Sequence, residues 1–170
     1  MRKQDSDKDL IAGSDPQGER AALPSYLHGW RFLSVIRSDD PEALAFKAMA
    51  ANEGPCIVVN PELVSHDDLE SPSKALLWVC AALNHIAHAV ISECLWTGHD
   101  IGRFDSPAWD LFREEASRHT TMGWSDIVMA ARREGVDYMA ETVAACLFVE
   151  SGLQSRLIGR ITGAGSIKLA

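Results

Sequence analysis

The chain has 170 residues, of which 46% are hydrophobic and 24% are charged, and its formal net charge is −8. These proportions are typical of a globular protein that is large enough to bury its own core. Nucleic acids and anionic membranes both bind clustered Lys and Arg, and the sequence has no basic cluster. We therefore expect neither of them as a partner.

Residues 1–24 are rich in charged side chains and poor in large apolar ones. Such a segment buries too little surface to offset the entropy lost on ordering, so we expect a mobile N-terminal arm followed by a single domain over residues 25–170. The arm has no apolar core of the kind found in secretory signals, and the four cysteines form no CxxC pair. These features predict a cytoplasmic protein with reduced thiols.

A strand–helix–strand pattern follows the arm. Residues 30–36 are β-branched or aromatic, which indicates a strand. Asp40 and Pro41 open a predicted helix that Gly54 ends, and residues 56–59 form a second apolar strand. Two strands joined in this way are parallel with a right-handed crossover.

The segment 72–96 is the predicted centre of the domain. Its apolar residues point nearly all round a helix, which is typical of a buried helix. Ser71 is a suitable N-cap, Pro72 suits the first helical position, and Gly98 is a suitable stop. One polar strip remains on this helix, and it comprises Asn84, His85, His88 and Ser92. These interruptions lead us to expect no membrane span, although the length is near that of one.

The C-terminal third contains two further predicted helices, from 107 to about 119 and from 125 to 134. Residues 136–150 fit a strand and a helix equally well, because short apolar runs do not separate the two periods. A last short strand is predicted at 166–169, after glycine-rich turns. The expected fold is an α/β domain with a small, mainly parallel sheet flanked by helices and a helix-rich middle; the alternative is a mostly α fold with one βαβ unit.

Three stretches at the two ends of the domain carry a family resemblance: residues 33–59, 130–141 and 157–169. They are similar to the DsrE/DsrF family of small sulfur-relay and related proteins. The stretch LSVIRSDDPEALAFKAMAANEGPCIVV resembles the first strand, helix and second strand of that family. AARREGVDYMAE resembles its later helix and Gly-Val-initiated strand, and LIGRITGAGSIKL resembles its closing turn and strand. The resemblance implies a compact α/β domain with a parallel sheet that assembles into oligomers.

The resemblance also implies where a reactive cysteine belongs. Active members carry it at the end of the Gly-Val strand, where this chain has Ala140 and Glu141. The nearest thiol is that of Cys146, which becomes the candidate catalytic residue, and Glu141 becomes a candidate ligand-binding residue. The apolar neighbours of Cys146 raise a thiol pKa, so a structural role for this cysteine is the competing interpretation.

Two other places are candidate ligand-binding sites. His85 and His88 are one helical turn apart, a spacing that suits a shared metal ion, but no HExxH or paired-carboxylate pattern accompanies them. We therefore predict no metal site and no cofactor, and interpret the two histidines as part of the polar strip. His66 and Asp67 follow the second predicted strand, where parallel sheets bind ligands, although we favour their interpretation as a polar turn with a helix cap.

Two functional hypotheses follow, and the sequence does not decide whether the protein is an enzyme. The first is a DsrE-like oligomeric protein for small-ligand binding or sulfur handling. The second is a non-catalytic, helical protein–protein interaction module. Both predict a homodimer or a higher homo-oligomer, because a helix that is apolar nearly all round needs cover on every side.

Overall fold

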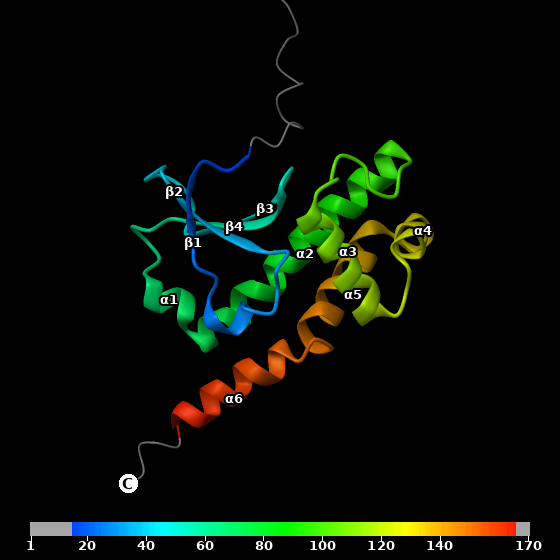
Figure 1. Ribbon diagram of the computed structural model, residues 1–170. Coiled ribbons are helices and arrows are strands. Elements are labelled where there is room, and N and C mark those ends of the chain that lie inside the picture. The colour runs from blue at the N-terminus through cyan, green and yellow to red at the C-terminus, as the bar shows by residue number, and fades with distance from the viewer. Residues whose placement is uncertain (1–14, 166–170) are drawn as a thin grey trace, which may run out of the picture.

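The computed structural model of the chain describes residues 15–165. The elements in this range are β1 (Gly18–Ala21), the 3-10 helix η1 (Ser25–Leu27), β2 (Ser34–Ser38), β3 (Phe46–Ala51), β4 (Gly54–Val59), α1 (His66–Glu70), α2 (Pro72–Thr97), α3 (Pro107–Thr120), α4 (Trp124–Glu134), α5 (Val136–Val149) and α6 (Leu153–Gly165). Figure 1 shows the sheet on one side of α2, with α4 and α5 on the other; α3 packs against both β4 and α5. The expected α/β class is confirmed.

The sheet has four strands in the order β1-β2-β4-β3. Strands β2 and β4 are parallel, as expected, but β2 begins at Ser34 and not at residue 30, and the segment between the two strands forms no helix. Strands β1 and β3 are antiparallel to their neighbours, so the sheet is mixed, and the expectation of a mainly parallel sheet is wrong. The sheet differs from the expected one in part because a segment that the sequence indicates as a helix forms a strand instead.

That strand is β3, which lies inside the segment predicted as a helix between the two parallel strands. Its alanine-rich sequence has a high helix propensity, but pairing with β4 through a two-residue turn at Asn52 and Glu53 overrides this local preference. Gly54 has φ +152°, which L residues rarely adopt, and a Cβ there would lie 2.6 Å from the Cβ of Ala108. Gly54 therefore opens β4 instead of ending a helix.

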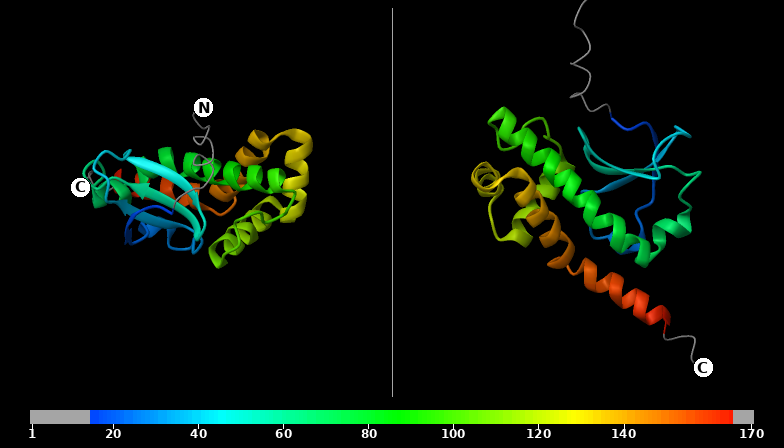
Figure 2. Two further views of the ribbon diagram at one scale, coloured as in Figure 1. Left: turned by 90° about the horizontal axis from the view of Figure 1, so that it is seen from above. Right: turned by 180° about the vertical axis from the view of Figure 1, so that it is seen from behind.

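Helix α2 confirms the predicted central helix almost residue for residue. It begins at Pro72 after Ser71 and ends at Gly98, which adopts the left-handed conformation. Nine of its residues are buried: Ala75, Val79, Ala82, Leu83, Ile86, Ala87, Val90, Ile91 and Cys94. Figure 2 shows α2 between the sheet and α5. One broad side of the helix is thus in the core, and the remainder lies at the surface.

The C-terminal third is helical throughout its described part. The ambiguous segment 136–150 is helix α5, so the Gly-Val strand that the family resemblance implies is absent at this place. Residues 157–165, expected as glycine-rich turns, belong to α6. The strand predicted at 166–169 lies outside the described residues. Gly18–Ala21, within the expected arm, form β1 and pair with β2.

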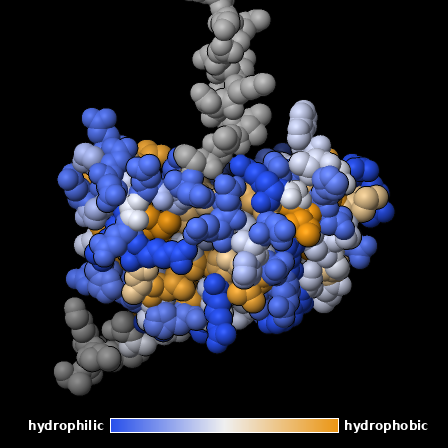
Figure 3. Space-filling view, turned by 45° about the horizontal axis from the view of Figure 1, so that its top comes forward, coloured by the Kyte–Doolittle hydropathy of each residue, from blue (hydrophilic) through white to orange (hydrophobic). Residues whose placement is uncertain are grey.

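The two faces of the sheet have different cover. Val35, Ile57 and Val59 belong to the main core, which includes α2, α3 and α5. The opposite face carries a separate small cluster made of Ile36, Ala51, Cys56 and Val58, with Met49 packed against it. Figure 3 shows hydrophobic side chains reaching the surface over the strand-containing half of the molecule, between hydrophilic ones.

Candidate functional site

One side of α2 faces solvent along a regular stripe. Leu77, Ala81, His85 and His88 are all exposed and follow one another at helical spacing, while the residues between them are buried or half-buried. Leu77 keeps 81% of its surface exposed, which is high for a large apolar side chain in the middle of a domain. This stripe forms the floor of two adjoining recesses, which together we name the α2 groove.

The apolar recess of the α2 groove lies between α2 and the edge strand β3. Its volume is about 460 Å³, and it is lined by Phe46, Lys47, Ala48, Ile57, Leu77, Trp78, Ala81, Ala82 and His85. The rings of Phe46 and Trp78 stack with centroids 5.2 Å apart, which joins the strand to the helix. The indole Nε1 of Trp78 is buried and has no hydrogen-bond partner among the described residues. The lining has no carboxylate.

The polar recess of the α2 groove lies between α2 and the first turns of α5. It has a volume of about 480 Å³ and is lined by Ala81, Asn84, His85, His88, Asp137 and Glu141. The Nε2 of His88 lies 3.0 Å from an Oδ1 of Asp137, and its Nδ1 lies 3.5 Å from the Oγ of Ser92. Three of the residues selected from the sequence, His85, His88 and Glu141, therefore lie together here.

No metal site accompanies these residues. Between residues 15 and 165, no three His, Cys, Asp or Glu side chains are grouped so that they could hold a metal ion. His88 uses one ring nitrogen on Asp137, and both side chains are largely open to solvent. The polar recess offers hydrogen bonds and charge to a bound partner.

The other two candidate ligand-binding residues lie elsewhere. His66 and Asp67 are exposed in the first turn of the short helix α1, which precedes α2. The capping box of α1 is made by Ser65 and Asp68. Asp68 also forms an ion pair with Lys74, and these interactions lower its pKa to about 2, with the Lys74 hydrogen bond as the main cause. His66 and Asp67 thus occupy a capped helix start, as the alternative interpretation states.

The cysteines are all free, and none of them has the character of a nucleophile. Burial raises the pKa of the Cys56 thiol to about 11 and that of the Cys94 thiol to about 11. Burial is also the first cause that raises the pKa of the half-buried Cys80 and Cys146. A thiolate is the reactive form, and these four thiols keep their protons at neutral pH. The proposed catalytic role of Cys146 gains no support from its surroundings.

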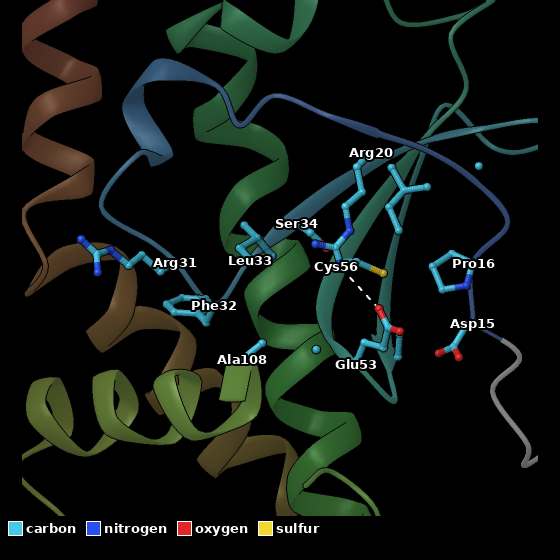
Figure 4. Close-up of a pocket in the computed structure, with 14 residues that line it drawn as sticks. Asp15, Pro16, Arg20, Arg31, Phe32, Leu33, Ser34, Glu53, Cys56 and Ala108 are labelled. Carbon is cyan, nitrogen blue, oxygen red and sulfur yellow. Dashed lines mark hydrogen bonds and ion pairs between the residues drawn. The ribbon is translucent and has the colours of Figure 1, made fainter. Parts of the chain in front are cut away.

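A third recess lies on the outer face of the sheet, and none of the residues selected from the sequence lines it (Figure 4). Its volume is about 360 Å³, and Cys56 and Ser34 lie in it. Arg20 of β1 reaches across to Glu53 in the β3–β4 turn, with 3.3 Å between Nη2 and Oε2. Only the pairing of β1 with β2 places Arg20 here, so no local sequence pattern indicates this recess. Burial raises the pKa of its thiol, that of Cys56, and one of its two arginines, Arg20, is paired with a carboxylate.

Comparison of the chain with protein-family models, with curated proteins and with solved structures finds no match. Among the described helices, α2 is long and apolar enough to cross a membrane by length and composition, with a mean hydropathy of 1.6 over its most apolar window. Core helices of soluble proteins meet the same criteria, and nine residues of α2 are buried against the rest of this domain.

Proposed function

We propose that this protein is a non-catalytic interaction module that associates with a second copy of itself through the α2 groove. The observation that carries this proposal is the exposure of Leu77 beside an open apolar recess that contains Phe46 and Trp78. Exposed apolar surface of this kind is typical of an interaction site. Large aromatic side chains are also the usual anchors of such sites.

The charge distribution favours a second copy as the occupant. The chain has a formal net charge of −8, so two copies repel each other over most of their surfaces. The apolar recess has Lys47 and His85 in its lining and no carboxylate. Two acidic chains that meet at this recess therefore bring no carboxylates of its lining against each other.

The alternative is sulfur handling in the manner of the DsrE/DsrF family, which stays a prediction from the resemblance. A sulfur relay needs one accessible cysteine with a lowered pKa. Burial raises the pKa values of all four cysteines, and this favours association over thiol chemistry as the function. A thiol titration of the folded protein at pH 7 separates the two functions, because a relay cysteine reacts rapidly and these four should react slowly.

Sedimentation velocity tests the association. We expect the wild-type protein to sediment as a dimer at about 50 µM, a concentration that detects micromolar affinities. Leu77→Asp places a charge in the apolar recess and should give a monomer with an unchanged circular dichroism spectrum. Met129→Asp is the matched control, because Met129 is an exposed apolar residue of α4 outside the α2 groove. A wild-type monomer, or a dimer that tolerates Leu77→Asp, contradicts the proposal.

A further inference from the structure

Strand β3 is an edge strand whose outer side has no strand partner within residues 15–165. It is the last strand in the order β1-β2-β4-β3 and pairs only with β4. Its sequence, FKAMAA, has no proline and one charged residue, Lys47. Natural proteins usually protect such edges with lysines, prolines, bulges or a covering element, and β3 has only the single lysine and a regular register with β4. The edge of β3 is therefore open to strand addition.

The ladder between β3 and β4 shows which backbone groups of β3 point to this open side. The turn closes on the pair Ala51 and Gly54, and the N–H of Asn60 donates to the carbonyl of Ala45 at 3.2 Å. Alternate residues of an antiparallel strand bond to the same neighbour, so the odd-numbered residues of β3 face β4. The N–H and C=O groups of Phe46, Ala48 and Ala50 consequently point outward, away from β4.

These three outward residues are arranged symmetrically about Ala48. In an antiparallel pair of two β3 strands centred there, Ala48 lies opposite Ala48, and Phe46 lies opposite Ala50 of the other copy. The large ring of each strand then meets the small methyl group of the other. Lys47 lies opposite Met49, so the two lysines do not face each other directly. The side chains of β3 thus complement those of an identical strand in size, and the single charge of each strand lies opposite an uncharged residue.

We infer that two copies of this protein pair through their β3 strands, antiparallel, about a two-fold axis that passes between the two Ala48 residues. This inference rests on the proposed function and adds how the two copies are arranged. About six backbone hydrogen bonds form across the axis. The two four-stranded sheets become one continuous sheet of eight strands. Strand addition to an exposed sheet edge is a general mode of protein recognition.

The pairing also covers the apolar recess. The recess lies beside β3, and its lining includes Phe46 and Ala48 of the strand and Leu77 and Trp78 of α2. A strand added to the β3 edge extends the sheet over this side of α2. The exposed side chain of Leu77 then lies under the partner, which explains why a large apolar residue is tolerated there.

Crosslinking tests the position of the axis. Opposed Cα atoms in a hydrogen-bonded antiparallel pair are about 5.5 Å apart, within the range that a disulfide spans. Ala48→Cys should therefore form a disulfide-linked dimer on mild oxidation, in a background with Cys80→Ala and Cys146→Ala. Asn52→Cys is the control, because the two Asn52 residues would lie roughly 27 Å apart in this arrangement.

A backbone substitution provides the second test. The outward N–H of Ala48 takes no part in the ladder with β4, so Ala48→Pro removes a donor from the intermolecular pair and leaves the internal pair intact. We expect a dimer that is on the order of 10–100-fold weaker, with an unchanged circular dichroism spectrum. If this variant does not fold, the crosslinking result decides alone.

The outcomes separate this inference from the proposed function. Suppose that Leu77→Asp dissociates the dimer but Ala48→Cys crosslinks no more than Asn52→Cys. This result overturns the strand pairing and leaves the association through the α2 groove in place. A wild-type protein that stays monomeric at about 50 µM overturns both. Efficient crosslinking at Ala48 and weakening by Ala48→Pro support both.

Discussion

The indole ring of Trp78 stacks on the phenyl ring of Phe46, with centroids 5.2 Å apart and an angle of 16° between the planes. This pair joins the edge strand β3 to the central helix α2 at the apolar recess. Both side chains are half-buried, so each contributes to the folded domain and also remains available to a partner. The stability of the fold and the shape of the candidate interface therefore depend on the same contact.

Replacing the phenyl ring of Phe46 tests how much the stacked pair contributes to the stability of the fold. Phe46→Ala removes the stacked partner of Trp78 and should lower the free energy of unfolding by about 1–3 kcal/mol, less than for a fully buried phenylalanine. Urea denaturation of the wild type and the variant measures the change. Phe46→Leu keeps most of the apolar volume and serves as the control. Equal stability of all three proteins would show that the stack does not hold β3 against α2.

The buried side of α2 allows a stronger prediction. Leu83 is 1% exposed and Ile86 is 0% exposed, so an alanine at either position leaves a cavity in the core. We expect each substitution to cost about 2–5 kcal/mol. Leu77→Ala, on the exposed stripe of the same helix, should change the stability by less than about 0.5 kcal/mol. Chemical denaturation of the three variants measures these changes. Similar losses of stability at all three positions would contradict the assigned orientation of α2.

The Cys56 thiol gives the stability a predictable dependence on alkaline pH. Burial, as the main cause, raises its pKa from an ordinary value of 9.0 to about 11. The unfolded chain therefore releases this proton near pH 9 while the folded chain keeps it to about pH 11, so the unfolded state binds fewer protons and stability falls as pH rises through this window.

Cys56→Ala removes this contribution. Between pH 9 and pH 11 the variant should lose less stability than the wild type, by on the order of 2 kcal/mol. Urea denaturation at several pH values measures both slopes. Parallel slopes for the two proteins would mean that Cys56 ionises normally in the folded state.

Truncation of the N-terminal region tests the extent of the expected arm. A protein that lacks residues 1–14 keeps β1 and every contact described above, so its melting temperature should match that of the full chain. Removal of residues 1–22 also removes β1, its ladder with β2 and the ion pair between Arg20 and Glu53. A lower melting temperature for the longer truncation alone is the expected result. Identical melting temperatures for all three proteins would show that β1 adds nothing to the stability.

Several features of the fold could be predicted from local sequence patterns. The bounds of α2 follow from Pro72, from Gly98 and from the apolar residues between them, because helix caps and helical periodicity act within a few residues. The buried positions of α3, Trp109, Phe112 and Ala116, follow from the same spacing. The parallel pair β2 and β4 was recognisable from two short apolar runs.

The candidate site could be predicted only in part. His85 and His88 share a helical face because of their spacing, and the sequence states this directly. Asp137 and Glu141 lie opposite them because of the way α5 packs on α2. Glu141 was selected for an unrelated reason, which is its place in the family resemblance. The thiol of Cys146 was selected for its place in the chain, and burial then raised its pKa.

By itself, the sequence determined the central helix and the helices that follow α2 up to Glu134, because helix caps and helical spacing act between residues that are close in the chain. It also indicated the apolar runs of β2 and β4, but their parallel pairing joins Ser34 to Cys56, which are far apart in the chain. Only the tertiary structure decided that residues 46–51 are a strand and residues 136–149 a helix. An alanine-rich run satisfies either conformation locally, and the hydrogen bonds offered by β4 select between them. The position of β4 between β2 and β3 leaves β3 at the edge of the sheet beside α2, and so creates the groove that no local pattern in the sequence describes.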